Sequence, residues 1–312
     1  MSHGSVTGGT GLDGPDPKAI TALNVRSGRT SIPVGRTQSG GDIVLLPEFG
    51  GTLLGLLSKP ELTGGDIYRV RRQTTRDEDA AKFVPKRAAK PEASFGYEVI
   101  DDRVRTLAVL SEPIPVQDLA DVPSLKDDVA NELANRIIWR LEDAIIRGEQ
   151  TDLDDAGREM FDGILNTTGV REQPYLVSPY RTIRRSLTVL EAAGYDPEAL
   201  SIGLNPLTWE ALETEVDENG RPLFSGLYTA RQEPVLFGRP VVLSNRLDEG
   251  ESIVADWRHG AATLRTDIEL SWSDGGDLFE TNTVRFRADL RAGFNLTQPG
   301  AFVHALLEPP TP

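Results

Sequence analysis

The feature of this sequence that most limits its fold is a long amphipathic segment at residues 124–147. Its apolar residues recur in steps of four, the spacing of a helix that buries one side: Leu125, Val129, Leu133, Ile137, Leu141 and Ile145. Ser124 is a favourable N-cap, and Gly148 is a favourable residue just past the last turn. About 24 residues at 1.5 Å each give a rod of roughly 36 Å, so other parts of the chain must cover it along one side.

A basic, polar stretch at residues 66–92 comes before this helix. Residues 67–75 combine aromatic and β-branched residues with arginine, which predicts a strand that cannot bury either face fully. Residues 94–110 return as a second strand that becomes more apolar toward Glu112, which predicts a hairpin with an exposed tip and an anchored base. A two-stranded ribbon alone is only marginally stable in water. We therefore expect something outside the fold to support this arm.

The charge of the arm differs from that of the whole chain. The arm carries eight Lys or Arg residues against five acids, whereas the chain has 33 basic and 48 acidic residues. A basic arm on an acidic body complements another copy of that body. The alternative is an ordinary solvated loop, and charge by itself does not separate the two. On the first interpretation the candidate intersubunit contacts are Arg69, Arg71, Arg72, Arg76, Lys82, Lys86, Arg87 and Lys90.

The composition excludes several kinds of protein. With no cysteine, the chain cannot form disulfides, iron–sulfur clusters or thiolate zinc sites. Residues 1–14 lack the basic and apolar regions of a secretory signal. The longest apolar stretch, residues 43–57, is interrupted by Pro47 and Glu48 and is too short to span a bilayer. We expect no membrane segment, and a formal charge of −15 disfavours non-specific nucleic-acid binding over the whole surface.

Motifs for catalysis, cofactors or metals are weak in this chain. None of the three histidines is spaced as a metal-binding pair, and no phosphate-binding loop or nucleophile elbow occurs. Residues 9–14 satisfy Gly-x-Gly-x-x-Gly, but no strand precedes them and prolines follow. Residues 152–157 resemble the start of a calcium loop, yet Gly163 stands where a bidentate glutamate is needed. We predict no enzyme, with no catalytic, cofactor-binding or metal-binding residues.

The remaining segments predict an α+β fold with much antiparallel sheet. Helices are expected at 178–194 and 205–216, because each begins at a capping residue followed by proline. A short helical pattern at 47–57 is expected to dock on the body, and residues 1–41 have the composition of an arm without a core. Strands are expected at 174–177, 200–204, 234–244, 252–256, 262–270 and 281–288.

Several of these segments follow one another in a particular order. An N-terminal arm and short helix come first, then an extended loop at about 62–111 and the long helix. No single segment is diagnostic, and the segments that make up the order are Leu110-Ser111-Glu112-Pro113-Ile114-Pro115, Ala144-Ile145-Ile146-Arg147-Gly148, Asp162-Gly163-Ile164-Leu165, residues 235–244, residues 252–257 and residues 278–294. This order and spacing resemble the major capsid protein of tailed bacteriophages, with the Hong Kong 97-type fold that encapsulin shell proteins share.

The resemblance implies how the chain is divided. It implies an N-terminal arm and small helix at 1–61, and an extended loop hairpin at 62–112. It also implies a peripheral domain at 113–162 plus 266–312, which contains the long helix as its spine, and an axial domain at 163–265.

The resemblance also implies a structural role in the virion. The chain would be the major capsid protein, self-assembling into an icosahedral head that encloses double-stranded DNA. Implied partners are other copies in hexamers and pentamers, a separate scaffold protein, a portal, decoration proteins and DNA by proximity. No cofactor is implied, and assembly is expected in the host bacterial cytoplasm.

Two other functions remain open at this point. One is an encapsulin-like compartment that encloses a cargo enzyme, which the absence of nucleic acid in purified shells would indicate. The other is an α+β enzyme with an unrecognised site, which a monomer that forms no particles would indicate.

Overall fold

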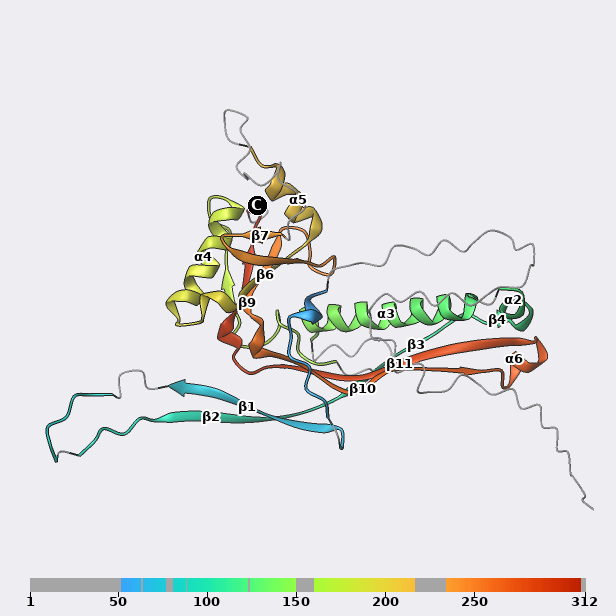
Figure 1. The fold of residues 1–312 in the computed structure, drawn as a ribbon, viewed down its shortest axis with the longest axis horizontal. Coiled ribbons are helices and arrows are strands. Elements are labelled where there is room, and N and C mark those ends of the chain that lie inside the picture. The colour runs from blue at the N-terminus through green and yellow to red at the C-terminus, as the bar shows by residue number, and fades with distance from the viewer. Residues whose placement is uncertain are drawn as a thin grey trace, which may run out of the picture.

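The computed structural model describes residues 52–62, 64–76, 81–87, 89–122, 124–149, 160–216 and 234–309 of the 312-residue chain. The expected arm at 1–41 and the calcium-like segment at 152–157 lie outside these residues. The fold has three parts (Figure 1). In the first part, which we call the plate, a long helix lies along a sheet. The second part, which we call the compact unit, is built on a second sheet. The third part is a hairpin of two strands that projects from the plate.

The plate consists of α3 (Leu125–Arg147) and an antiparallel sheet beneath it. The sheet has four strands, which are β10 (Gly260–Ser273), β11 (Thr283–Leu296), β3 (Arg105–Leu110) and β4 (Ile114–Pro115). β11 lies between β10 and β3 and also pairs with β4. A helical turn, α6 (Asp277–Glu280), joins β10 to β11, and these two strands correspond to the strands predicted at 262–270 and 281–288.

One face of β11 packs against α3. Side chains alternate between the two faces of a strand, and every second residue of β11 is buried, namely Val284, Phe286, Ala288, Leu290, Ala292 and Phe294. From the helix, the stripe spaced in steps of four contributes Leu133, Ile137, Leu141 and Ile145 to the buried residues. Burying one large apolar side chain contributes about 1.5–3 kcal/mol, so these two complementary patterns hold the plate together.

The start of α3 differs in detail from the prediction. Leu125 and Val129 belong to the predicted apolar stripe but are only half-buried. Ser124 takes the N-cap position, yet its side chain makes no capping hydrogen bond, since its own backbone is helical with φ −71° and ψ −23°. A six-residue helix, α2 (Val116–Asp121), precedes it and was not predicted, because it buries no residue and so leaves no apolar periodicity.

The end of α3 corrects the role predicted for Gly148. Its φ is −50°, so no left-handed turn requires glycine there. A side chain would instead collide with backbone, because an added Cβ would lie 2.4 Å from the carbonyl oxygens of Ala144 and Phe161. Gly163 is equally close to the helix end, with its Cβ position 2.6 Å from the Gly148 nitrogen. The two glycines therefore allow residues 160–165 to lie directly against the end of the helix.

This close approach satisfies the carbonyl groups that a helix leaves free at its C-terminus. The backbone nitrogens of Ile164 and Leu165 donate to the carbonyl oxygens of Ile145 and Ile146, at 2.7 and 3.0 Å. Asn166 donates from its side chain to the carbonyl of Gly148 at 3.0 Å. The end of α3 is thus fixed to the segment that leads into the compact unit.

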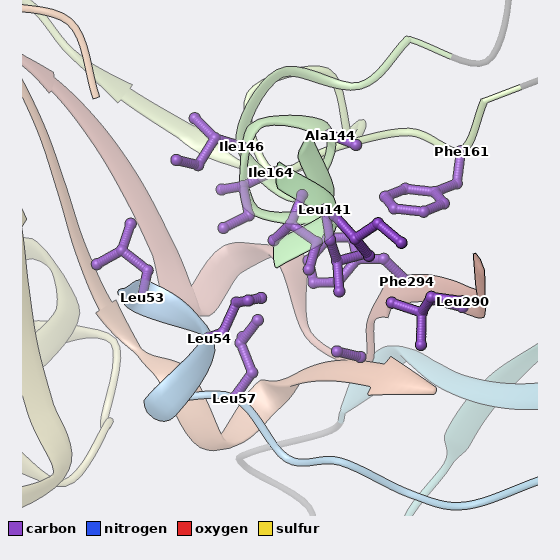
Figure 2. Close-up of a cluster of buried hydrophobic side chains, with 14 of the residues drawn as sticks. Leu53, Leu54, Leu57, Leu141, Ala144, Ile146, Phe161, Ile164, Leu290 and Phe294 are labelled. Atoms are coloured by element: carbon purple, nitrogen blue, oxygen red, sulfur yellow. The ribbon is translucent and has the colours of Figure 1, made fainter. Parts of the chain in front are cut away.

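The beginning of the described chain docks on the same end of α3, as Figure 2 shows. Within the predicted short helix at 47–57, the structure describes only a 3-10 turn, η1 (Leu53–Gly55). Leu53, Leu54 and Leu57 are buried in the main core, so the predicted docking on the body is confirmed. The Leu53 nitrogen donates to the buried carboxylate of Glu142 on α3 at 2.7 Å. Residues 58–62 then run parallel to the start of β10.

The compact unit has a six-stranded sheet covered by helices. In order across the sheet, its strands are β5 (Arg171–Gln173), β12 (Phe302–Leu306), β9 (Glu251–Asp256), β6 (Leu200–Leu204), β8 (Arg239–Leu243) and β7 (Val235–Leu236). The helices are α4 (Pro179–Ala192) and α5 (Pro206–Thr214), with the 3-10 turns η2 (Pro197–Ala199), η3 (Trp257–His259) and η4 (Pro299–Ala301). Both helices confirm the predicted caps: Ser178 accepts from Arg181 N, and Asn205 accepts from Leu207 N.

Three observed strands differ from the prediction. The strand expected at 174–177 lies earlier, at β5, where proline does not interrupt the pairing. The strand expected at 234–244 is a hairpin, because Phe237 and Gly238 both have positive φ and turn the chain between β7 and β8. The last strand, β12, was not predicted at all.

Two strands also fall in a different part of the molecule from the one expected. The segment 266–312 was grouped with the long helix, but β12 pairs with β9 and β5 and so belongs to the compact unit. The segment 62–112 was assigned to the extended loop, but β3 pairs with β11 inside the plate. The other domain boundaries stay a prediction.

Candidate assembly surface

The hairpin consists of β1 (Ile67–Arg76) and β2 (Phe95–Arg103). The two strands are antiparallel, with Ile67 opposite Arg103 and Arg71 opposite Val99. Within the described part of the chain, neither strand pairs with any other. Figure 1 shows the hairpin extending away from the plate, with its tip at the far left. The hairpin predicted from the sequence is therefore present, and it projects as an arm.

One face of the hairpin presents apolar side chains to solvent. On β2 this face carries Phe95, Tyr97 and Val99, which are 54%, 64% and 53% exposed. The residues opposite them on β1 include Arg71, and Ile67 near the base is also exposed. A row of exposed aromatic and aliphatic residues is the usual mark of a contact surface.

The other face is anchored to β11 at the base of the hairpin. Tyr68 is buried, and its hydroxyl donates to Asp102 Oδ2 at 2.8 Å and lies 3.3 Å from the carbonyl oxygen of Phe294. Burial, together with the nearby charge of Asp102, raises the pKa of Tyr68. Gly293 makes room for the ring, since an added Cβ would come within 2.6 Å of it. Tyr68 thus fits into a notch that only glycine leaves open.

Charged groups add to this anchor. Asp66 forms ion pairs with Arg265 on β10 and with Arg291 on β11, the latter at 2.8 Å. Arg105 donates to Asp102 at 2.9 Å, and its guanidinium lies 5.8 Å from the ring centre of Phe161. The anchored base predicted for the hairpin is confirmed by these contacts.

Two of the eight candidate contact residues are engaged within their own chain. Arg69 forms a two-point ion pair with Asp101 on the opposite strand, with distances of 2.6 and 2.9 Å. The hydrogen bond from Arg69 lowers the pKa of Asp101. Arg72 is half-buried and donates from Nε and Nη2 to the carbonyl oxygen of Leu296 at 3.3 and 3.2 Å. These two arginines therefore stiffen the arm and its attachment.

Of the other candidates, Arg71 lies on β1 between Arg69 and Arg72, and the remaining ones lie toward the tip. Their side chains are exposed and form no ion pair with any residue that the structure describes, and they are Arg71, Lys82, Lys86, Arg87 and Lys90. The side chain of Arg76 lies outside the described residues. Between the basic residues stands Phe83, whose side chain is fully exposed. Phe83 is not among the eight candidate residues, although an aromatic residue between lysines is itself a sign of a contact.

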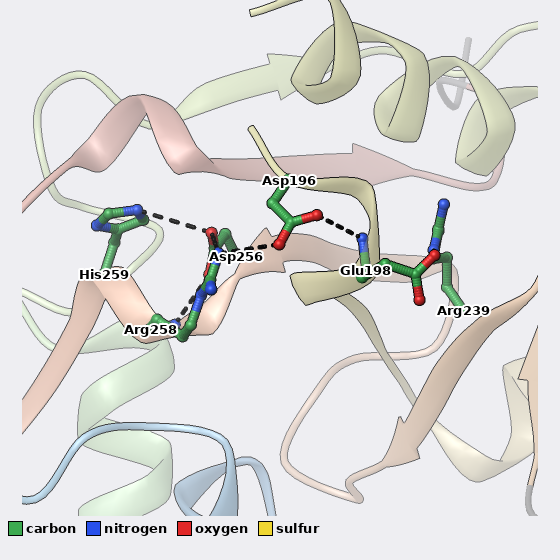
Figure 3. A network of polar contacts seen from close by, with 6 residues as sticks. All are labelled: Asp196, Glu198, Arg239, Asp256, Arg258 and His259. Atoms are coloured by element: carbon green, nitrogen blue, oxygen red, sulfur yellow. Dashed lines mark hydrogen bonds and ion pairs between the residues drawn. The ribbon is translucent and has the colours of Figure 1, made fainter. Parts of the chain in front are cut away.

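A second group of polar residues lies in the compact unit, as Figure 3 shows. The buried carboxylate of Asp256 accepts from Arg258 Nε at 2.9 Å and from Arg258 Nη2 at 2.7 Å, and His259 Nε2 lies 3.7 Å away. Burial acts to raise the pKa of Asp256, but the bonds from Arg258 and the charges of His259 and Arg258 outweigh it and lower the pKa. These groups bind one another, so the network fastens the turn η3.

Among the residues that the structure describes, no group of three His, Cys, Asp or Glu side chains is placed to bind a metal ion. None of the helices described there is both long and apolar enough to cross a membrane.

Comparison with known proteins gives a consistent result. The model of the phage capsid family matches residues 38–305. No curated protein sequence matches the chain. Among solved structures, the capsid of an empty GTA particle is 16% identical with a TM-score of 0.69, covering 88% of this chain and 96% of that one.

Two other solved structures share the fold. The one titled Mycobacterium phage Adephagia is 15% identical with a TM-score of 0.67, covering 90% of this chain and 96% of that one. The virus-like particle from Pyrococcus furiosus is 16% identical with a TM-score of 0.55, covering 82% of this chain and 92% of that one. The fold of the chain is therefore that of Hong Kong 97-like shell proteins.

Proposed function

The chain belongs to the phage capsid family and is a major capsid protein of a tailed phage, and we propose that the arm β1–β2 of each copy joins it to the next. The predicted structural role is thereby confirmed, and the encapsulin-like alternative is not favoured. The contact made by the arm and the form of the closed shell belong to the proposal.

The observation that carries this proposal is the unsupported exposed face of the hairpin. A two-stranded ribbon is marginal by itself, and this one leaves Phe95, Tyr97 and Val99 in solvent. Covering such a row with a neighbouring subunit removes apolar surface from water at about 25 cal/mol per Å². In a closed shell, symmetry repeats each contact many times, so an individually modest interface is sufficient.

The resemblance to capsid proteins supports the finer details of the proposal. The subunits would form hexamers and pentamers of an icosahedral head, assembled in the host bacterial cytoplasm around a separate scaffold protein, with a portal and decoration proteins as further partners. Packaged DNA would lie near the wall without specific contacts, since a net charge of −15 repels it. The compact unit, which contains most of residues 163–265, would surround the five- and six-fold axes.

Electron microscopy of the purified protein tests the proposal directly. We expect closed, angular particles, and we expect particles recovered from infected or induced cells to contain DNA. A protein that stays monomeric in size-exclusion chromatography over a range of salt and protein concentrations would contradict the shell. Closed particles that enclose a protein cargo and no nucleic acid would instead support a compartment of the encapsulin kind.

A further inference from the structure

One loop of the compact unit lies directly against the long helix of the plate. It joins β8 to β9, and we call its residues 244–250 the junction loop. Two side chains of α3 hold it. Glu142 Oε1 accepts from Ser244 Oγ at 2.9 Å, and Arg147 forms an ion pair with Asp248 at 2.6 Å. The junction loop is therefore fastened to the plate near both of its ends.

The same loop is also bonded to the interior of the compact unit. Ser244 N donates to the carbonyl oxygen of Leu204, at the end of β6, at 2.8 Å. Asn205, which caps α5, donates from its side chain to the carbonyl oxygen of Leu247 at 2.6 Å. Leu247 is buried in the main core. A movement of the junction loop would therefore displace the end of β6 and the start of α5.

The N-terminal end of the described chain bonds to the same carboxylate oxygen. Leu53 N of η1 donates to Glu142 Oε1 at 2.7 Å, so a single oxygen atom accepts from η1 and from the junction loop. Glu142 is only 1% exposed. Three parts of the molecule that are far apart in the sequence, namely η1, α3 and the junction loop, thus meet at this one side chain.

The two donors depend on each other through the carboxylate that they share. Burial raises the pKa of Glu142, and the hydrogen bonds from Leu53 N and Ser244 Oγ and the charge of Arg246 oppose that effect. A buried carboxylate is costly unless it is hydrogen-bonded. Each bond also holds the carboxylate where the other donor needs it. Loss of one donor should therefore weaken the bond to the other.

We propose that Glu142 couples the docking of η1 to the position of the compact unit on the plate. If η1 leaves, Glu142 loses one donor, and its bond to the junction loop weakens. Coupling free energies are reciprocal, so cutting the loop from Glu142 must loosen η1 by the same amount. Residues 1–51 lead directly into η1, so a partner that pulls on them would change how the compact unit sits on the plate. This coupling acts within a single subunit and does not depend on shell formation.

Apolar packing offers a second route between the same parts. A Cβ added at Gly203 would lie 3.0 Å from Leu53 Cδ2 and 3.4 Å from Leu247 Cδ1, so both side chains approach the same glycine. Packing and the shared carboxylate predict the same direction of coupling. A test must therefore remove the carboxylate while it leaves these two leucines unchanged.

Hydrogen exchange of the full-length, unassembled subunit tests the coupling. Ser244→Ala removes the loop's donor to Glu142 and leaves the residues of η1 unaltered. The backbone amides of residues 53–57 are expected to exchange about fivefold faster, because their segment loses part of its anchor. Thr208→Val is the matched control. It removes the hydroxyl that accepts from Gly250 N at 3.0 Å, which loosens the junction loop without touching Glu142, and it should leave exchange at residues 53–57 unchanged.

The same substitutions in a Glu142→Ala background identify the route. Without the carboxylate, Ser244→Ala should no longer accelerate exchange at residues 53–57. Full acceleration in this background would assign the coupling to packing and overturn the proposal. Equal acceleration by Ser244→Ala and Thr208→Val in the otherwise native chain, or none by Ser244→Ala, would also overturn it. If the Glu142→Ala protein does not fold, the comparison in the otherwise native chain decides alone.

Discussion

The hairpin β1–β2 and the central strand β6 both carry apolar residues, but β6 buries them and one face of the hairpin exposes them. In β6, all five residues are buried, and the strand pairs with β9 on one side and β8 on the other. In the hairpin, each strand has one partner, and one face carries exposed Phe95, Tyr97 and Val99. β6 buries its apolar residues within its own chain, whereas the hairpin leaves Phe95, Tyr97 and Val99 uncovered by its own chain. β6 therefore packs entirely within its own subunit, whereas we propose that a neighbouring subunit covers the exposed face of the hairpin.

The largest effect on the stability of the subunit is expected inside the compact unit. Ile202 on β6 is completely buried, so Ile202→Ala should lower the free energy of unfolding by about 2–5 kcal/mol through lost burial and a new cavity. Urea denaturation of the unassembled subunit measures this. Leu207→Ala, at a position 56% exposed on α5, is the control and should change little. Similar losses for both variants would show that the compact unit is not the independently packed part.

A buried carboxylate of the plate provides the second test. Glu142 accepts from Leu53 N at 2.7 Å and from Ser244 Oγ at 2.9 Å, and burial raises its pKa. Glu142→Ala leaves both donors without this acceptor and should cost about 1–3 kcal/mol of the free energy of unfolding. Chemical denaturation of the unassembled subunit gives the value.

The raised pKa of Glu142 also predicts a pH dependence. The folded state holds the proton more tightly than the unfolded state, whose glutamate pKa is about 4.3. Its contribution is therefore fully present below that value and is lost as pH rises through the folded pKa. The wild type should lose stability relative to Glu142→Gln over this range, as denaturation at several pH values would show. Glu249→Gln, at an exposed site that forms no ion pair with another described residue, serves as the control; a constant difference between wild type and Glu142→Gln would refute the assignment.

The attachment of the hairpin is expected to be weaker than the core. Gly293→Ala should displace the Tyr68 ring from its notch, since the new Cβ would approach the ring to 2.6 Å. Loss of the associated hydrogen bonds is worth about 1 kcal/mol, so hydrogen exchange in β1 should become about fivefold faster. Gly64→Ala is the matched control, because a Cβ there meets nothing within 4 Å. Unchanged exchange in Gly293→Ala would mean that other contacts, such as those of Asp66, hold the arm.

The smallest effect on the subunit is expected on the exposed face of the hairpin. Tyr97→Ser with Val99→Ser should change the free energy of unfolding by less than about 0.5 kcal/mol, because both side chains are already in solvent. Shell yield by negative-stain microscopy should nevertheless fall. Val177→Ser, at a position 76% exposed in the compact unit, controls for general loss of apolar surface. A full yield from the double variant would remove the main argument for the arm contact.

Much of the fold was predictable because it depends on local spacing. The steps of four in α3, the capping residues Ser178 and Asn205, and the apolar run of β6 act over a few residues and gave the right elements. The basic arm was also recognisable from composition. Prediction failed where no local pattern exists: α2 buries no residue, and Gly148 is explained by the approach of residues 160–165 and not by its own turn.

For the candidate surface, the sequence identified the arm but not the role of each arginine. Arg72 bonds to Leu296, which is 224 positions away in the chain, and no spacing rule connects the two. The exposed Phe83 was overlooked because a single aromatic residue carries no periodicity.

The sequence by itself determined that this chain has a long half-buried helix, an acidic body and a projecting basic arm, because periodicity and charge are properties of neighbouring residues. Only the tertiary structure decided which face of the arm is exposed and which sheet receives β12. Those features depend on packing between residues far apart in the chain. Which distant residues pack against each other depends on the complementary shapes of their surfaces, and no local sequence pattern encodes that complementarity.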